Sequence, residues 1–294
     1  MDVPAGPNAM SVDVEDYFQV SAFAHRVRPA DWPGYEPRVA RNTFRLLALL
    51  EGAGVRATFF VLGWVAERNP GLVRAIAAAG HEIACHGYSH ELVYRQTPAQ
   101  FQRETRQAKA ILEDQVQAPV IGYRAASYSI VEHSRWALDV LYELGFLYDS
   151  SIFPVRHDRY GIPDAPVAPH TVCTPQGAQL AEFPPTAVDY LGLRFPVGGG
   201  WFRLYPYALT RSLLMRLASE RPFMFYVHPW EIDPEQPRIS AGARSHFRHY
   251  LNLHRCEARI ERLLGDFSLA PVRDVLERAA LLPPREIPMA RAHG

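Results

Sequence analysis

Short apolar runs alternate with amphipathic stretches along most of the chain, and glycine and proline separate them. The apolar runs predict buried strands at residues 10–12, 56–62, 82–86, 119–124, 146–149, 180–183 and 223–228. The amphipathic stretches predict helices at residues 42–50, 70–79, 98–112, 134–144, 207–219 and 248–264. Strands that alternate with helices in this way are typical of a parallel sheet or barrel in one large α/β domain.

Capping and turn signals support several of these boundaries. Asn69 is expected to cap a helix with Pro70 at its first position, and Thr97 begins a capping-box pattern. Residues 156–206 are rich in proline and glycine, which predicts loops and insertions, and residues 198–201 predict a flexible turn.

Composition narrows the class of protein. Hydrophobic residues make up 48% and charged residues 21% of the chain, as in an ordinary globular protein. Thirty-one Lys and Arg residues balance thirty-one Asp and Glu residues, so a nucleic-acid partner is not expected. No apolar run reaches the length of a membrane span, and residues 1–9 lack the features of a signal peptide, so stable membrane insertion is not expected. Three cysteines without paired spacing favour a reducing, cytoplasmic location.

Polar side chains follow five of the predicted strands. In parallel α/β folds, reactive side chains collect at the carboxyl ends of strands. The five strand ends carry Asp13 with Glu15 and Asp16, His86 with His90, Arg124 to Tyr128, Asp149 with two serines, and Tyr226 with His228.

Two of these groups could hold a cation. Histidines spaced by four residues can converge on one ion, and a carboxylate from another strand can complete the site. A solvated acidic turn and an accidental histidine pair are the ordinary alternatives for each group taken alone. Cys85 precedes His86, but strand alternation places the two on opposite faces, so we expect Cys85 in the core.

The order of the five groups resembles the polysaccharide deacetylases of carbohydrate esterase family four, over roughly residues 10–230. Segments 11–16, 86–90, 124–128, 149–154 and 226–228 are similar to the five motifs of that family. Segments 13–20, 200–203 and 228–231 are similar to a subgroup associated with exosortase and exopolysaccharide loci. In this chain Ala126 stands where the family often has proline, and Tyr226 stands where it usually has leucine.

The resemblance implies a distorted (β/α) barrel of about seven strands, with a C-terminal helical and loop extension. It also implies Zn²⁺ or another divalent ion held by Asp16, His86 and His90. Glu15 is the alternative ligand because it shares the strand face of Asp13, whereas Asp16 has the usual side chain but requires the strand to turn. We favour Asp16.

The resemblance further implies a role for each remaining residue. Asp13 is expected to be the general base and His228 the general acid, with Arg124 orienting Asp13 and Asp149 orienting His228. The backbone N–H of Tyr128 is expected to stabilise the oxyanion.

These inferences predict an N-deacetylase acting on N-acetylated oligo- or polysaccharides, in exopolysaccharide biosynthesis. The expected organisation is a flexible leader at residues 1–9, a catalytic domain at 10–235 and an extension packed on the barrel at 236–294. Two alternatives stay open: a hydrolase of small amides or formamides on the same fold, and a catalytically decayed carbohydrate-binding protein. In the second, Trp201, Tyr205, Tyr207 and Trp230 would offer stacking faces. The sequence leaves the oligomeric state, the sugar and its linkage undetermined.

Overall fold

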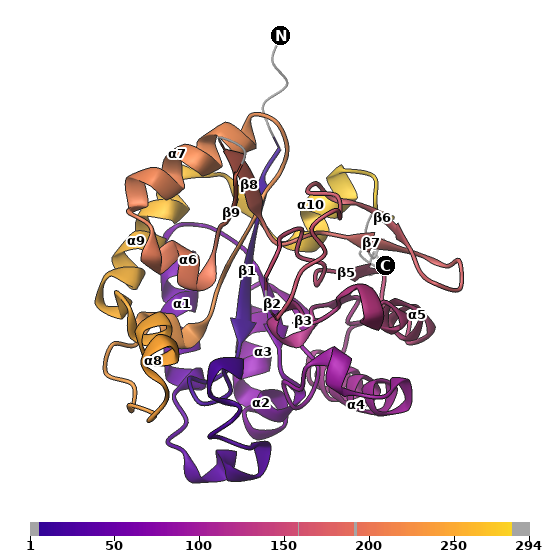
Figure 1. The fold of residues 1–294 in the computed structure, drawn as a ribbon, viewed down its shortest axis with the longest axis horizontal. Helices are drawn as coiled ribbons and strands as arrows, with labels where there is room; N and C mark the ends of the chain where they lie inside the picture. Colours follow the sequence, from indigo (N-terminus) through magenta and orange to yellow (C-terminus); the bar gives the residue numbers. More distant parts are fainter. Residues whose placement is uncertain (1–5, 158, 191–192, 284–294) are drawn as a thin grey trace, which may run out of the picture.

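The computed structural model describes residues 6–157, 159–190 and 193–283 of the 294-residue chain, and Figure 1 shows its fold. A curled sheet forms its centre and helices cover the outside. No helix within these described ranges is long and apolar enough to cross a membrane.

The main sheet has nine strands in the described part of the chain. Consecutive parallel neighbours are β10 (Met224–Val227), β1 (Asn8–Val14), β2 (Thr58–Val61), β3 (Glu82–Cys85), β4 (Gly122–Tyr123), β5 (Tyr148–Asp149) and β7 (Gln179–Glu182). β6 (His170–Cys173) pairs antiparallel with β7, and β11 (Leu269–Ala270) pairs with the start of β1. β8 (Ala187–Tyr190) and β9 (Leu193–Pro196) form a separate hairpin. The α/β fold with a distorted, barrel-like sheet is therefore confirmed.

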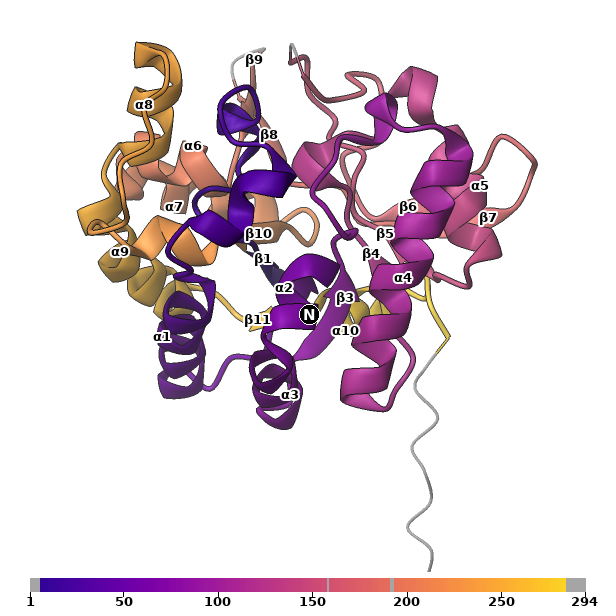
Figure 2. The same ribbon diagram turned by 90° about the horizontal axis from the view of Figure 1, so that it is seen from below.

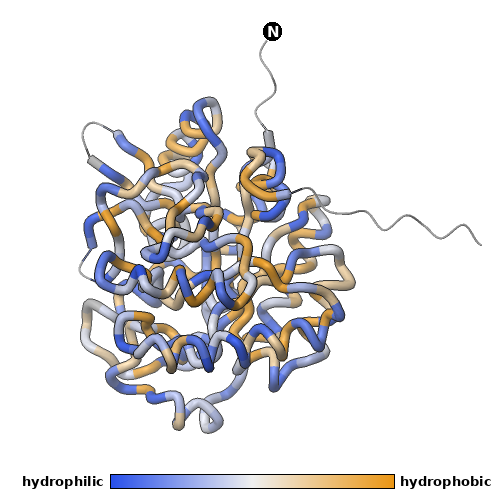
Figure 3. Tube along the Cα trace, turned by 90° about the vertical axis from the view of Figure 1, so that its right-hand side faces the viewer, coloured by the Kyte–Doolittle hydropathy of each residue, from blue (hydrophilic) through white to orange (hydrophobic). Residues whose placement is uncertain are grey.

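Ten α-helices occur in the described residues. They are α1 (Val39–Gly52), α2 (Gly63–Arg68), α3 (Pro70–Ala78), α4 (Pro98–Val116), α5 (Trp136–Glu143), α6 (Gly199–Leu204), α7 (Tyr207–Ala218), α8 (Ala243–Tyr250), α9 (Leu253–Asp266) and α10 (Val272–Arg278). Figure 2 shows α1, α3 and α4 following one another around the outside of the strands. Figure 3 shows hydrophobic and hydrophilic positions alternating along the outer helices, as expected where only one helix face is buried.

Alternation along each strand creates two buried layers. Met10, Val12 and Val14 pack outward into the large core beneath the helices. Ala9 and Phe60 instead belong to a smaller core inside the curl of the sheet. The outer layer holds the helices on the sheet, and the inner face carries polar side chains at the carboxyl ends of the strands.

Helix α10 closes the curl at the amino ends of the strands. The Val272 N–H donates to Thr58 Oγ1 at 2.7 Å, and the Arg273 N–H donates to the Glu82 carboxylate. Tyr148 also donates to Glu82, at 3.0 Å. Polar groups that would otherwise be buried without partners therefore bind the C-terminal helix to the middle strands.

A side chain bridges the open side of the sheet. Thr186, just beyond β7, accepts the Met224 N–H at 2.8 Å and donates to the Met224 carbonyl at 2.7 Å. The edge of β10 that faces away from β1 is thus hydrogen-bonded at Met224 without a further strand.

Most predicted elements are confirmed, including the Thr97 capping box at the start of α4. Asn69 is the N-cap residue of α3 and Pro70 is its first residue, as predicted, but the Asn69 side chain donates to the Val65 carbonyl and makes no capping hydrogen bond. Two local predictions are wrong. The helix predicted at 248–264 is broken into α8 and α9 by Asn252, whose φ is 53°. The turn predicted at 198–201 is largely the first part of α6.

Parts of the predicted leader, residues 1–9, and of the predicted extension, residues 236–294, belong to strands and helices. Asn8 and Ala9 are buried in β1, whereas residues 1–5 lie outside the described residues. Within 236–283, α9 contacts the segment after β10, and α10 contacts β1.

Replacing Gly122 by alanine should destabilise the fold, because a Cβ there would overlap the ring of Tyr148. That ring is buried and tied to Glu82, so it cannot move freely. We expect a loss of about 1–3 kcal/mol in the free energy of unfolding, measured by urea denaturation. The matched control is Gly71→Ala, where nothing lies within 4 Å of the added Cβ. It should be neutral or slightly stabilising, and an equal loss in both variants would contradict the packing argument.

Candidate metal centre

Three side chains converge at the carboxyl ends of β1 and β3. Potential ligand atoms of Glu15, His86 and His90 all lie within 4.8 Å of one another. Glu15 follows the last residue of β1, His86 follows the last residue of β3, and His90 lies in the next loop. One carboxylate and two imidazoles suit a divalent ion such as Zn²⁺.

The hydrogen bond of His86 leaves one ring nitrogen available to a metal. Its Nδ1 lies 2.8 Å from the Arg124 carbonyl. A carbonyl only accepts, so Nδ1 carries the proton and Nε2 presents its lone pair. Burial, the largest influence, lowers the pKa of His86 to about 4, so the ring is neutral at physiological pH.

The second histidine and the carboxylate meet at the same point. His90 has a left-handed backbone conformation, with φ at 54°, which turns the loop back toward β1. Its Nε2 lies 2.8 Å from Glu15 Oε2, yet this buried oxygen has no hydrogen bond of acceptable geometry. A buried carboxylate oxygen without a hydrogen bond, beside two imidazoles, is what a cation site requires.

Glu15 is ionised in this environment. Burial favours the neutral acid, but His90, His228 and His86 lower the pKa of Glu15 well below its usual range. Its second oxygen, Oε1, accepts the indole N–H of Trp230 at 3.1 Å. The two oxygens of this carboxylate therefore have different partners.

Asp13 and Arg124 form a buried pair beside these ligands. Arg124 is 0% exposed and donates to Asp13 Oδ1, and it also donates to the hydroxyls of Ser11 and Ser150. Its guanidinium lies over the Phe60 ring at 3.9 Å. Asp13 Oδ2 lies on the side of His228, whose Nε2 is 3.8 Å away.

His228 lies opposite the histidine pair and has a carboxylate partner that the sequence did not reveal. Its Nδ1 is 3.0 Å from Glu231 Oε2, and its Nε2 is directed toward Asp13 and Glu15. Burial acts to lower the pKa of His228, but Glu231, Glu15 and Asp13 raise it to about 9. The ring is therefore protonated at neutral pH and can donate from Nε2.

The structure does not bring Asp16 to the histidine pair, contrary to the preference drawn from the sequence. Its Oδ2 accepts the N–H groups of Arg38 and Val39, at 2.7 and 2.9 Å, and its Oδ1 accepts the Tyr17 N–H. These are the free donors at the start of α1, so Asp16 acts as a helix cap supplied from another segment. Glu15 takes the position beside the histidines.

Asp149 does not reach His228 either. It lies on the face of β5 away from the inner core and accepts the Ser151 hydroxyl at 2.6 Å. Ser151 in turn accepts the Ala125 N–H at 2.8 Å. Asp149 therefore supports the loop after Arg124 and does not orient His228.

The Tyr128 N–H has another partner than the one expected. It donates to the Ala125 carbonyl at 3.0 Å, so it is not free to stabilise an oxyanion. The Tyr128 ring is buried against Tyr226 and Arg124. Cys85 is buried in the outer core as expected, and burial raises the pKa of its thiol to about 12.

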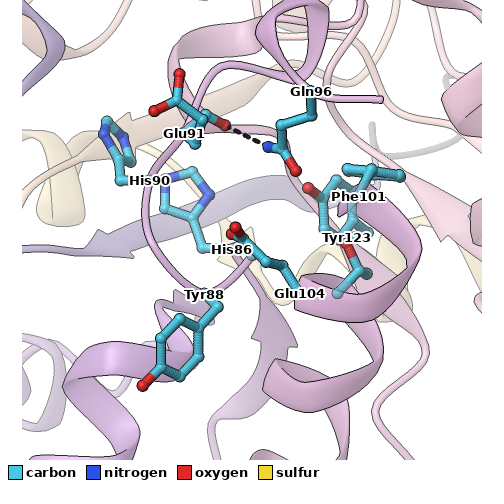
Figure 4. A pocket seen from close by; sticks show the side chains of 11 residues that line it. His86, Tyr88, His90, Glu91, Gln96, Phe101, Glu104 and Tyr123 are labelled. Carbon is cyan, nitrogen blue, oxygen red and sulfur yellow. Dashed lines mark hydrogen bonds between the residues drawn. The ribbon is translucent and has the colours of Figure 1, made fainter. Parts of the chain in front are cut away.

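A small polar pocket lies behind His86, and Figure 4 shows its lining residues. Gln96 donates to the Glu91 carbonyl at 3.0 Å, and Glu104 accepts the Ser89 hydroxyl. Ser89 and Glu91 flank His90 in the sequence, so these contacts hold the chain on both sides of that histidine.

Comparison with known families divides the chain into two parts. Residues 33–147 match the family model described as polysaccharide deacetylase, and residues 150–277 match a domain of unknown function, DUF3473. The peptidoglycan deacetylase-like protein FGM2 of Gibberella zeae is 34% identical over 110 residues, which are 37% of this chain and 32% of that protein. A chitooligosaccharide deacetylase of a Bradyrhizobium species is 32% identical over 96 residues, which are 33% of this chain and 42% of that protein. The chain thus matches less than half of these relatives' lengths, and the matches support the polysaccharide deacetylase family.

Two solved structures share the fold over nearly the whole chain. A Mycobacterium smegmatis protein described as a polysaccharide deacetylase has a TM-score of 0.61 and 23% identity, covering 98% of this chain and 96% of that one. The Puue allantoinase has a TM-score of 0.58 and 15% identity, covering 94% and 91%. At these identities the likeness concerns the fold alone.

The two candidate carboxylates should respond differently to neutralisation. Glu15→Gln should weaken Zn²⁺ affinity by more than the 10- to about 100-fold typical of losing a residue outside the ligand set. Asp16→Asn should leave the affinity unchanged and lower the free energy of unfolding by about 0.5–2 kcal/mol, because it weakens a helix cap. Titration calorimetry of the metal-free proteins, with urea denaturation, checks both. Loss of metal affinity in Asp16→Asn alone would assign the ligand to Asp16.

Proposed function

We propose that this chain is a metal-dependent hydrolase that removes N-acetyl groups from sugars of an oligo- or polysaccharide. The matches to the polysaccharide deacetylase family support this proposal. The observation that carries the proposal is the convergence of Glu15, His86 and His90, with His228 Nε2 within 4 Å of both Glu15 and Asp13. A base, an acid and a ligand set meet at one end of the sheet, as hydrolysis of an amide requires.

Glu15 Oε2, His86 Nε2 and His90 Nε2 would hold the divalent ion. A bound Zn²⁺ or similar ion supplies a Lewis acid for the acetamide carbonyl and lowers the pKa of bound water. The buried oxygen of Glu15 and the neutral ring of His86 fit this assignment.

Asp13 is the proposed general base. Its Oδ1 is held by Arg124, so Oδ2 is the oxygen left to take a proton from the attacking water. Arg124 is itself fixed by Ser11 and Ser150, which makes it a positioning residue for the base. The role predicted from the sequence, in which Arg124 orients Asp13, is therefore kept in this proposal.

His228 is the proposed general acid. It is protonated at neutral pH, and its Nε2 faces the same space as Asp13 Oδ2. A proton held at Nε2 can pass to the leaving amine as the C–N bond breaks. The proposed acid and base thus face the same space beside the ligand set, where the acetamide would bind.

The decayed, sugar-binding alternative has less support. The proposed base, acid and ligands are all present, and two of its four expected stacking faces are buried, Tyr207 and Trp230. A role in exopolysaccharide biosynthesis and a cytoplasmic location are further parts of our proposal. They are supported by the subgroup resemblance and by three cysteines that are all free.

The purified protein should release acetate from N-acetylated oligosaccharides, and a chelator should abolish this release. Enzymatic acetate assays over a panel of N-acetylglucosamine oligomers and exopolysaccharide fragments measure it, with restoration by added Zn²⁺ as the control. Turnover of cyclic amides or formamides in place of the sugars would support the small-amide hydrolase. Sugar binding without any turnover would support the binding protein.

Asp13→Asn should keep metal affinity and lose at least about 100-fold in kcat, because the amide cannot accept the proton. His86→Ala should lose metal and turnover together, since it removes a ligand. Calorimetry and acetate release distinguish the two failures. Full activity in Asp13→Asn would remove Asp13 as the base even if the ion still binds.

A further inference from the structure

We propose that the single turn His228–Glu231 positions both halves of the site: Trp230 holds the metal carboxylate, and Glu231 holds the general acid. The proposal rests on the function proposed above. It assigns two positioning residues, neither of which belongs to the ligand set or touches the reacting atoms.

The first half concerns the rotamer of Glu15. A glutamate side chain has more rotatable bonds than an aspartate, so a ligand at this position needs a further contact to fix its carboxylate. Trp230 supplies it, because its Nε1–H donates to Oε1 at 3.1 Å and leaves Oε2 toward His90. An indole nitrogen can only donate, so this contact also excludes a metal from Oε1 on that side.

Trp230 is itself held by two stacked imidazole rings. Its ring stacks on His228 with centroids 5.0 Å apart and on His249 with centroids 4.2 Å apart. Only 4% of the residue is exposed. The indole therefore has little freedom to rotate, and the direction of its N–H is fixed.

The second half concerns the direction of the His228 ring. Glu231 Oε2 lies 3.0 Å from both the backbone nitrogen and Nδ1 of His228. One carboxylate oxygen thus fixes the backbone and the ring together, and it requires the proton on Nδ1. The remaining nitrogen, Nε2, is then aimed at Asp13.

A buried arginine from α6 anchors Glu231. Arg203 donates through Nε to Glu231 Oε1 at 2.6 Å, and its NH1 donates to the carbonyls of His249 and Leu251. Burial opposes ionisation, but Arg203 and His228 lower the pKa of Glu231 to about 2. The carboxylate is thus charged, and both of its oxygens have hydrogen-bond partners. A buried carboxylate needs such partners to hold another group in a fixed position.

The start of α6 braces the same strand end. Gly198 and Gly199 have φ angles of 111° and 48°, and a Cβ on either would overlap the Tyr226 ring. Tyr226 lies two residues before His228 and packs against it. Trp230, Glu231 and the residues that support them all lie in the segment that matches a domain of unknown function, so we assign that segment a part in building the proposed catalytic centre.

The test separates the two roles by different readouts. Trp230→Phe keeps an aromatic ring and removes the N–H, so the Zn²⁺ affinity of the metal-free protein should fall about 10- to 100-fold. Glu231→Gln should leave that affinity unchanged and lower kcat about 10- to 100-fold at saturating metal, with KM little changed. Titration calorimetry and acetate release measure the two effects.

Matched controls are available elsewhere in the chain. Trp136→Phe removes an indole N–H on α5, and Glu257→Gln neutralises a half-exposed glutamate paired with Arg45. Both should leave metal affinity and kcat unchanged. If Trp230→Phe does not fold, Trp230→Leu replaces it, because leucine also has no donor. The double variant Arg203→Met/Glu231→Gln replaces a Glu231→Gln that does not fold because Arg203 has lost its carboxylate partner.

Two outcomes overturn the proposal: unchanged Zn²⁺ affinity in a folded Trp230 variant, or unchanged kcat in a folded Glu231 variant. If the wild-type protein shows no deacetylation, the metal arm still tests Trp230. The imidazole ¹⁵N shifts of His228 then test Glu231, since the Nδ1–H signal should change in Glu231→Gln and not in Glu257→Gln. Failure of the proposed function is thus distinguishable from failure of this inference.

Discussion

A buried guanidinium at the centre of the sheet determines what the surrounding residues can do. Arg124 is removed from solvent, so its charge requires the carboxylate of Asp13 and the hydroxyls of Ser11 and Ser150. Its carbonyl, in turn, sets the tautomer of His86. One residue therefore fixes a proposed base through its side chain and a proposed ligand through its backbone. Loss of either contact would leave a polar group buried without a partner, which ties the geometry of the site to the stability of the fold.

The site joins two parts of the chain that match different families. His86 and His90 lie in the deacetylase match, whereas His228, Trp230 and Glu231 lie in the domain of unknown function. The sheet makes this possible, because β10 pairs in parallel with β1 and brings the ends of both strands together. Side chains distant in sequence are therefore held on adjacent strands, where small backbone movements are resisted by the ladder on both sides of β1.

The alternation of side chains between the two faces of a strand explains much of what the sequence could predict. Apolar alternation and the order of polar strand ends predicted the fold class and brought Asp13, His86, His90, Arg124 and His228 into one list. The same alternation favoured Glu15 as the metal ligand and would have excluded Asp149 as a partner of His228, because Asp149 follows the inward-facing Tyr148. The sequence prediction nevertheless chose Asp16, because aspartate is the usual side chain of the family at this position. Glu231 was missed because its contact depends on a tight turn after His228, and Asn252 broke a helix whose hydrophobic pattern continues across it.

The pairing of β1 has a consequence for how the molecule is made. On one side β1 pairs with β2, which is nearby in the sequence. Its other neighbours are β10 and β11, so Ala9 cannot pair until Met224 has been synthesised, and Asn8 cannot pair until Leu269 has been synthesised. During translation the first strands emerge with an edge that has no partner until most of the chain has left the ribosome. The proposed ligand residues are synthesised early and the proposed acid, His228, late, so the candidate site is completed only after β10 has paired with β1. Such long-range strand pairing favours slow folding, because the two ends of the chain must meet before the sheet is complete.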